Sequence, residues 1–171
     1  MAGERFEGVR VPDPGFAGDT GAVPADVGAA LASYADDPGA YAAALATLRT
    51  ARLLVPVVAL LGEVATDEAG LRHDKSSDMA AVLLTGADGR TALLGFTGTE
   101  PLHRWRADAR PVPVTAQVAA RAALQEGAAA LVVDVGGPVP FVVQGEDLVG
   151  LAAGWRIARV GETTGWVRPA P

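Results

Sequence analysis

The sequence predicts an α/β (α+β) fold: a single domain in which helices cover a mixed β-sheet, with a helical hairpin near the N-terminus. Three observations support this prediction. Apolar residues recur at helical spacing in several segments, short apolar runs lie between those segments, and two of the runs are joined by a glycine-containing turn. Hairpins combined with helical crossovers are typical of a mixed sheet covered by helices. The length of 171 residues fits one domain of ordinary size.

The first part of the chain predicts an irregular arm followed by the helical hairpin. Residues 1–23 are rich in Gly, Pro and Asp and show little periodicity. Pro24 suits the first turn of a helix, and Asp37 suits the N-cap of the helix that follows. One face of the first helix holds Val27, Leu31 and Tyr34. One face of the second helix holds Tyr41, Ala44, Leu45 and Leu48. These faces need an apolar surface to pack on, which we expect to be the sheet.

Three apolar runs predict the first strands. Residues 53–59 contain Pro56, which lacks a backbone donor and therefore indicates an edge strand or a bulge. Residues 79–85 are apolar at successive positions, as expected for a central strand that is covered on both faces. The turn at residues 86–90 leads into residues 91–96, so we expect these two strands to form a hairpin.

The middle of the chain predicts two helices separated by a short edge strand. A helix is expected to begin within residues 97–101, with Leu102 facing inward. Residues 111–114 alternate proline with valine and are expected to be extended at a sheet edge. A helix capped by Thr115 should then end near Gly127, which suits a left-handed C-terminal cap.

The last part of the chain predicts three further strands, one helix and a tail. Apolar runs predict strands at residues 131–135, 141–143 and 156–160. Glu146 and Asp147 suit the first turn of the helix before the last strand, where acidic side chains favour the helix dipole. We expect the domain to span residues 24–160 and residues 161–171 to form a loose C-terminal tail.

Composition limits the classes of function. A net charge of −6 argues against a nucleic-acid partner, because phosphate contacts depend on clustered Lys and Arg. The chain has no cysteine, which excludes disulfides and thiolate catalysis and fits a reducing cytoplasm. Its longest apolar stretch, residues 53–61, is about half the length that a membrane span needs. We therefore expect a soluble cytoplasmic protein with no membrane partner.

The polar block at residues 71–78 is the first candidate site. It contains the only lysine of the chain and runs directly into the apolar residues of a predicted strand. A rigid strand can hold loop groups in place, so the block could contact a small ligand or a partner protein. The candidate binding residues are His73, Lys75, Ser76, Ser77 and Asp78. The alternative is a solvated loop in which Ser77 or Asp78 caps a turn.

A cluster of basic and aromatic residues, Arg104, Trp105 and Arg106, is the second candidate, as a protein interface. Trp and Arg are enriched at interface hot spots. In the alternative, Trp105 fills the core while the two arginines extend into solvent, and we favour this alternative.

No motif of the sequence assigns a cofactor, a metal ion or a catalytic mechanism. His73 and His103 lie far apart, and the chain has neither cysteine ligands nor a carboxylate-rich calcium loop. It also lacks a phosphate-binding glycine loop and a Gly-x-Ser-x-Gly nucleophile motif. We therefore expect no cofactor, no metal and no catalytic residues.

Several motifs occur in the order found in one protein family. They are the runs 51–57 and 74–79, Phe96-Thr97 followed by Trp105, and the runs 111–114 and 131–138. Together they resemble the SseB protein N-terminal domain family, in its actinobacterial form, over about residues 15–150. The resemblance implies an association with serine sensitivity and no established catalytic residues. A type III secretion translocon component shares the name, but the sequence lacks the long membrane-active helices that such a role requires.

These observations lead to one functional hypothesis and two alternatives. We expect a non-enzymatic, regulatory domain that binds a partner protein or a small molecule. The first alternative is an enzyme that uses Lys75, His73 or Asp78 as an acid or base. The second is a self-associating structural module that forms a homo-oligomer, which prolines on edge strands and the tryptophans Trp155 and Trp166 suggest.

Overall fold

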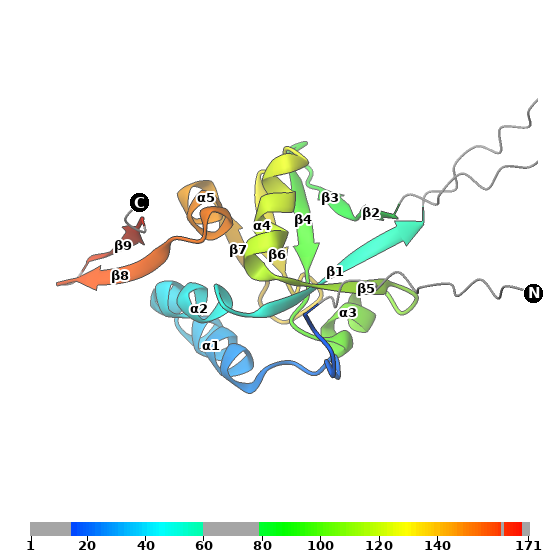
Figure 1. Ribbon diagram of the computed structural model, residues 1–171, viewed down its shortest axis with the longest axis horizontal. Coiled ribbons are helices and arrows are strands. Elements are labelled where there is room, and N and C mark those ends of the chain that lie inside the picture. The colour runs from blue at the N-terminus through cyan, green and yellow to red at the C-terminus, as the bar shows by residue number, and fades with distance from the viewer. Residues whose placement is uncertain (1–14, 60–78, 162, 169–171) are drawn as a thin grey trace, which may run out of the picture.

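The computed structural model describes residues 15–59, 79–161 and 163–168 (Figure 1). The helices are α1 (Ala25–Asp36), the 3-10 turn η1 (Pro38–Ala40), α2 (Tyr41–Leu48), α3 (Thr99–Trp105), α4 (Ala116–Gln125) and α5 (Gly145–Ala153). The strands are β1 (Arg52–Ala59), β2 (Met79–Ala81), β3 (Leu83–Thr85), β4 (Thr91–Gly95), β5 (Arg110–Thr115), β6 (Ala130–Val133), β7 (Phe141–Gln144), β8 (Arg156–Val160) and β9 (Thr163–Val167). They form a single α+β domain with mixed strand directions and an N-terminal helical hairpin, as the sequence predicts.

The strands form two linked sheets and a separate hairpin. The β1 sheet has the order β2-β1-β5 and is antiparallel, and the β4 sheet has the order β3-β4-β6-β7. In the β4 sheet only β4 and β6 run parallel, with Leu93 opposite Leu131. Reciprocal hydrogen bonds of 2.8 Å between Leu54 and Phe96 join the two sheets. The strands β8 and β9 pair only with each other among the described residues.

The core lies on both faces of the β4 sheet because side chains alternate along its strands. Leu93, Leu131 and Val133 face the helices α1, α2, α4 and α5 in the larger cluster of buried side chains. Leu94 and Phe96 face the other way and pack with Leu102 of α3 in a smaller cluster. All five of these leucine and phenylalanine side chains are fully buried. The sheet is therefore a central layer with unequal helical cover on its two sides.

Local signals in the sequence predict the helix ends correctly. The side chain of Asp37 accepts a hydrogen bond of 2.8 Å from the Gly39 amide at the start of η1. The Thr115 hydroxyl accepts one of 3.2 Å from the Val118 amide at the start of α4. Gly127 follows α4 with a φ of 69°, the left-handed conformation expected there.

Prolines explain how β1 and β5 are arranged. The sequence predicts an edge strand or a bulge at residues 53–59, and the edge alternative is wrong because β1 is the middle strand of its sheet. Its Pro56 lies opposite Pro111. Because the backbone amide and carbonyl of Leu54 bond to Phe96, the backbone polar groups of even-numbered residues in β1 point away from β5. Pro56 therefore lacks its amide where the neighbour of β1 changes from Phe96 to β2. The backbone nitrogens of Pro111 and Pro113 point to the outer edge of β5, where no neighbouring strand among the described residues needs a donor, as the sequence predicts for an edge strand.

The predicted central strand at residues 79–85 is wrong. The segment is divided at Val82 into β2 and β3, which lie at the edges of different sheets. Leu84 is 41% exposed, whereas Leu93 and Leu94 of β4 are fully buried. An apolar run cannot by itself distinguish an edge strand from a central one. The central strands of the β4 sheet are β4 and β6.

The predicted loose tail at residues 161–171 is also wrong for its described part, because residues 163–167 form β9. Trp166 of β9 packs against α5, and its Nε1 donates a hydrogen bond of 2.8 Å to Asp147. The close approach of the indole ring depends on Gly150, since a Cβ atom there would overlap the ring. Trp166 and Ile157 of β8, which packs on the same core cluster, thus attach the β8–β9 hairpin to the domain.

We predict that Gly150→Ala lowers the free energy of unfolding by about 1–3 kcal/mol, because the added methyl group overlaps Trp166. Glycine to alanine usually stabilises a helix, so Gly28→Ala in α1 is the control. There a Cβ atom would have an ordinary contact of 3.4 Å with Val23, and we expect a gain of roughly 0.5–1 kcal/mol. Urea unfolding measures both. A loss for Gly150→Ala that persists in a Trp166→Ala background would contradict the explanation.

Candidate functional site

A groove between α1 and α3 is the candidate functional site. We call it the α1–α3 groove. One side of α1 forms its first wall, with Gly28, Leu31, Ala32 and Ala35. The second wall is formed by α3 and the loop after β6, with Glu100, Pro101, Arg104, Gly137, Pro138 and Val139. Thr97 and Asp134 lie between the walls, and the cavity has a volume of about 240 Å³.

The parallel pairing of β4 and β6 brings Thr97 and Asp134 together. Gly95 at the end of β4 lies opposite Val133 at the end of β6, so the residues after both strands reach the same edge of the sheet. The Asp134 carboxylate accepts a hydrogen bond of 2.9 Å from the Thr97 amide and one of 2.7 Å from its hydroxyl. The carboxyl ends of parallel strands are where ligands bind in many α/β sheets.

The backbone of Asp134 has an unusual conformation. Its φ of 54° is the only positive value at a described residue other than glycine. The Asp134 amide donates to Gly95, and the Asp134 carbonyl accepts a hydrogen bond of 2.8 Å from Gly137, which closes a turn. Gly136 of this turn lies against Trp105, with only 3.3 Å between a Cβ atom placed there and the Trp105 Cβ. Backbone strain of this kind concentrates at functional sites.

Burial is the main influence on the charge of Asp134. It raises the pKa of the Asp134 carboxyl, because burial disfavours the charged form. The two hydrogen bonds from Thr97 act in the opposite direction, and the nearby Glu100 adds a smaller upward effect. Glu100 itself is exposed and forms an ion pair with Arg104 on the rim of the groove. The groove therefore has one half-buried acid near its floor and a neutralised charge pair at its edge.

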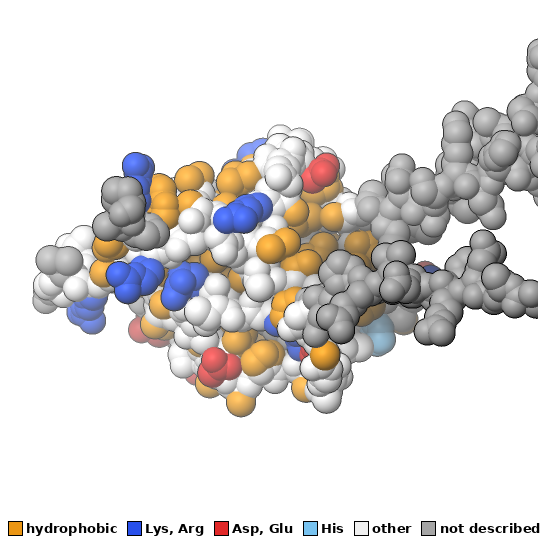
Figure 2. Space-filling view, in the orientation of Figure 1, with side chains coloured by type: hydrophobic (Ala, Val, Ile, Leu, Met, Phe, Trp, Pro, Cys, Tyr) orange, Lys and Arg blue, Asp and Glu red, His pale blue; other side chains and the backbone are white. Residues whose placement is uncertain are grey.

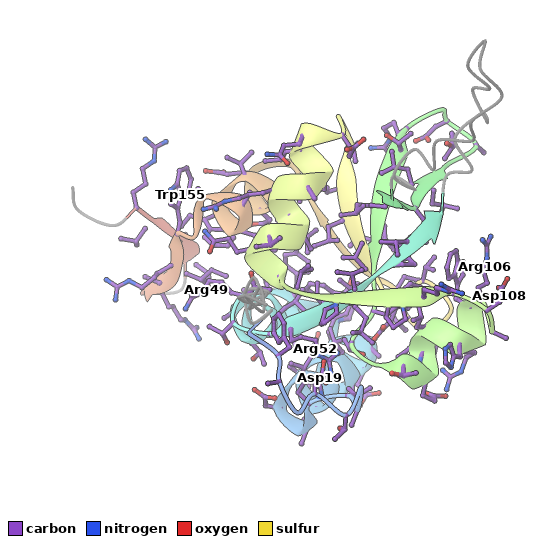
Figure 3. The ribbon with its side chains drawn as sticks, turned by 45° about the vertical axis from the view of Figure 1, so that its right-hand side comes forward. Asp19, Arg49, Arg52, Arg106, Asp108 and Trp155 are labelled. Atoms are coloured by element: carbon purple, nitrogen blue, oxygen red, sulfur yellow. The ribbon has the colours of Figure 1, made fainter. Side chains whose placement is uncertain are left out.

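Arg52 ties the segment before α1 to this region. Its guanidinium donates 2.8 Å to the Thr97 carbonyl and 2.9 Å to the Ala22 carbonyl, and it forms an ion pair with Asp19 (Figure 3). The Thr99 amide donates to the Gly21 carbonyl at 2.7 Å. Residues 15–24 contain neither helix nor strand, as expected for an irregular arm, but these bonds hold them beside the groove.

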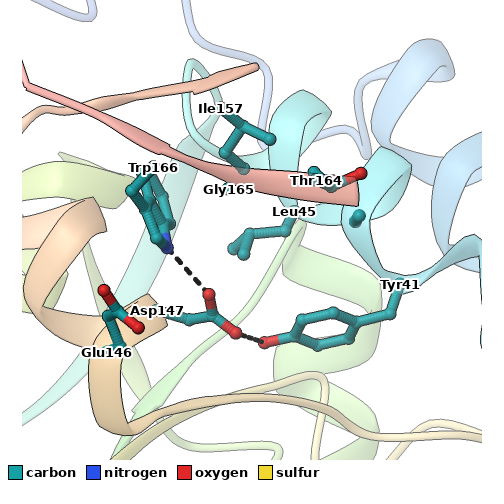
Figure 4. Close-up of a pocket in the computed structure, with 9 residues that line it drawn as sticks. Tyr41, Leu45, Glu146, Asp147, Ile157, Thr164, Gly165 and Trp166 are labelled. Carbon is teal, nitrogen blue, oxygen red and sulfur yellow. Dashed lines mark hydrogen bonds between the residues drawn. The ribbon is translucent and has the colours of Figure 1, made fainter. Parts of the chain in front are cut away.

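A second pocket of about 270 Å³ lies between α2, α5 and β9 (Figure 4). Asp147 accepts a hydrogen bond of 3.0 Å from the Tyr41 hydroxyl and one of 2.8 Å from Trp166. Burial and the bond to Asp147 raise the pKa of the Tyr41 phenol, so it remains a neutral donor. Tyr41 also stacks on Phe141 with ring centroids 5.0 Å apart. Both carboxylate oxygens thus attach the hairpin and α2 to α5, which is a structural role.

The structure describes only part of the predicted sites. His73, Lys75, Ser76, Ser77 and Asp78 lie outside the described residues, so their prediction remains untested. The cluster of Arg104, Trp105 and Arg106 is described. Trp105 packs on Phe96 in the smaller core cluster, which fits the core alternative. Arg106 stacks on the outside of the Trp105 ring, and Arg104 lines the α1–α3 groove.

Sequence reasoning missed Thr97 and Asp134. Thr97 directly follows the predicted strand 91–96, whereas Asp134 lies inside the predicted strand 131–135, which the structure ends at Val133. The available signal was a polar residue at or near the end of each strand. This signal alone could not predict a site, because only the parallel pairing of β4 with β6 places the two residues at one edge of the sheet.

Residues 15–59, 79–161 and 163–168 contain neither a metal-binding cluster nor a membrane-spanning helix. No group of three or more histidine, aspartate or glutamate side chains is placed to hold a metal ion there. None of the helices in this part of the chain has the length and hydropathy of a membrane span.

Comparison with known proteins identifies one family. The family model described as SseB protein N-terminal domain matches residues 27–149, which include both walls of the α1–α3 groove. No curated protein and no solved structure shows significant similarity to the chain.

We predict an order of stability for substitutions at Asp134. Asparagine tolerates a positive φ and can keep both contacts with Thr97, so Asp134→Asn should change the unfolding free energy little. Asp134→Ala should lower it by about 1–3 kcal/mol, because it loses the hydrogen bonds and keeps the strain. Asp134→Gly relieves the strain and should fall between them. Denaturant unfolding gives the order, and an alanine variant as stable as the asparagine variant would contradict it.

The raised pKa of Asp134 predicts a dependence on pH. The folded state binds the Asp134 proton more tightly than the unfolded state, so protonation of this group stabilises the fold. The unfolding free energy of the wild type, minus that of Asp134→Asn, should therefore rise as the pH falls from neutral through the raised pKa to below the ordinary aspartate value of about 3.9. Taking the difference between the two proteins removes the contribution of the other carboxylates to the pH dependence. A difference that falls over this range would contradict the assignment.

Proposed function

The chain belongs to the SseB protein N-terminal domain family, and we propose that it is a non-enzymatic domain that binds a partner protein or a small molecule through the α1–α3 groove. The observation that carries this proposal is the Thr97–Asp134 pair, held between two apolar walls where the parallel strands end. Ligand sites commonly combine mainly apolar walls with a few fixed polar groups.

The shape of the groove favours a small occupant. A volume of about 240 Å³ is below that of most drug-sized sites and suits one anchoring side chain of a partner protein or a compact metabolite. The exposed apolar groups on its rim include Val139, which is 41% exposed. Burial of such groups on binding would supply the affinity.

The chemistry of the groove favours an occupant with a hydrogen-bond donor at its tip. Each Asp134 oxygen already accepts one bond from Thr97 and has a further acceptor position. The two existing bonds fix the carboxylate before a ligand arrives, so little freedom is lost on binding. An occupant with an apolar body and a hydroxyl, amide or ammonium group at its end would satisfy both the walls and the acid.

Several features support a binding role over catalysis. General acid–base catalysis needs a positioned acid or base within reach of a second reacting group. Among the described residues that line the groove, Asp134 is the only partly buried ionisable group, and it is engaged by Thr97. Within the described part of the chain, the one hydroxyl beside the carboxylate is that of Thr97, which is only 1% exposed and therefore closed to a substrate. A rigid half-buried carboxylate in this setting is better suited to recognition.

We also propose that this binding is regulatory and takes place in the cytoplasm, without nucleic-acid or membrane partners. The absence of cysteine and the net charge of −6 support this setting. The abundance of arginine with a single lysine supports an actinobacterial, GC-rich source.

The proposal can be tested by filling the groove. Ala32 is exposed on α1 and lines the groove, so Ala32→Phe should obstruct it without disturbing the core. Ala29 is exposed on the same helix but does not line the groove, and Ala29→Phe is the matched control. Each variant and the wild type would be used to capture proteins and metabolites from native lysate, with quantification by mass spectrometry.

We expect the set captured by the wild type to be retained by Ala29→Phe and reduced roughly tenfold or more by Ala32→Phe, since a blocked anchor costs at least about 1.4 kcal/mol. Circular dichroism would verify that both variants fold. Equal recovery by all three proteins would refute a role for the groove in binding.

A further inference from the structure

We propose that the chain has a second binding surface, centred on Trp155, that takes an acidic segment of a partner protein. The Trp155 surface consists of Arg121, Trp155, Arg156, Val167 and Arg168. All of it except Arg121 lies beyond residue 149, where the family match ends. The proposal therefore does not depend on the function assigned to the α1–α3 groove.

Contacts at the base of the β8–β9 hairpin gather these residues. Arg168 stacks on the Trp155 ring, with the guanidinium carbon 4.5 Å from the ring centroid. Arg156 pairs with Val167 across the hairpin, directly next to Trp155 and Arg168. Arg121 of α4 donates a hydrogen bond of 2.8 Å to the Ala152 carbonyl near the end of α5. Trp155 lies at the outside of the domain beside this hairpin (Figure 3).

The surface is basic, and no carboxylate among the described residues forms an ion pair with its arginines, Arg121, Arg156 and Arg168. By contrast, Arg52, Arg90 and Arg104 each form one. Between residues 148 and 168 the sequence has one carboxylate, Glu162, which lies outside the described residues. Basic side chains gather over the hairpin and the neighbouring helices in Figure 2. On a chain of net charge −6, these three arginines form a local site of opposite sign within the described residues.

The hairpin presents this surface in a fixed position. Its other tryptophan, Trp166, packs on Gly150 and donates to Asp147, so Trp166 is used to attach the hairpin. Trp155 is half-buried and has no hydrogen-bond partner for its indole among the described residues. Val167 is 44% exposed beside it. An aromatic ring, an exposed apolar group and free guanidinium groups on a rigid element are the composition of an interface hot spot.

The Trp105 site has a similar stack of arginine on tryptophan but different charges around it. Arg106 stacks on Trp105 at 4.8 Å, much as Arg168 stacks on Trp155. Around Trp105, however, Glu100 and Asp108 mix acidic with basic charge, and the ring itself packs on Phe96 in the core. The two sites share a geometry and differ in their charge, so the Trp105 site is the natural control.

An acidic protein segment fits the Trp155 surface better than nucleic acid. Guanidinium groups pair with carboxylates through two parallel hydrogen bonds, and the exposed ring and Val167 can bury an apolar side chain of the same segment. Binding to a nucleic-acid backbone would need a longer basic track, and a net charge of −6 opposes the approach of a polyanion.

The test uses the full chain and a short glutamate-rich peptide with one central leucine. Binding would be followed by the intrinsic tryptophan fluorescence and by calorimetry. Arg156→Glu with Arg168→Glu reverses two charges at the surface, and Arg106→Glu with Arg110→Glu makes the same change of net charge at the control site. A lysine-rich peptide of the same length and a single-stranded homopolymer RNA are the comparison probes.

We expect the acidic peptide to bind the wild type and the control variant alike, and to bind the Arg156→Glu, Arg168→Glu variant at least on the order of tenfold more weakly. Trp155→Phe should remove the fluorescence change but retain binding by calorimetry. Equal weakening in both double variants would overturn the proposal, because it would show a response to net charge alone. No binding of the acidic peptide, or tighter binding of the RNA or of the lysine-rich peptide, would also overturn it.

Discussion

The parallel pairing of β4 with β6 is the constraint on which the rest of the structure depends. It is the one parallel pair among the described strands, and it places two connecting segments at the same edge of the sheet. Thr97 and Asp134 meet there, and Thr97 donates two hydrogen bonds to the Asp134 carboxylate, which fix the turn after β6 and the start of α3. The walls of the α1–α3 groove follow from these positions. A change in strand order would separate the acid from its partner and remove the site.

The fold class could be predicted from the sequence because it depends on local signals. Helical spacing at Val27, Leu31 and Tyr34, and the caps at Asp37 and Thr115, are properties of neighbouring residues. Strand position is not local, and the central position assigned to residues 79–85 was wrong for that reason. The tail was misjudged because Trp166 gains its place from a distant hydrogen bond to Asp147. Asp134 escaped notice because its role depends on a neighbouring strand.

The two proposed binding surfaces differ in how they are built. The α1–α3 groove lies within the matched family region and uses one acid fixed by hydrogen bonds inside apolar walls. The Trp155 surface lies mainly on the hairpin after that region and uses exposed positive charge around an aromatic ring. Gly150 and Trp166 attach the hairpin to α5, next to the Asp147–Tyr41 contact. A domain with both surfaces could hold one occupant in the groove while it contacts an acidic protein at its other end.

The most direct test of the central claim is backbone NMR of the isotope-labelled chain, with and without the partner or metabolite that the wild-type protein captures. If the occupant binds in the α1–α3 groove, the largest shift changes will occur at the Thr97 and Gly137 amides and along the groove side of α1, near Ala32 and Ala35. Changes confined to other parts of the chain, with Thr97 and Gly137 unmoved at saturation, would contradict it.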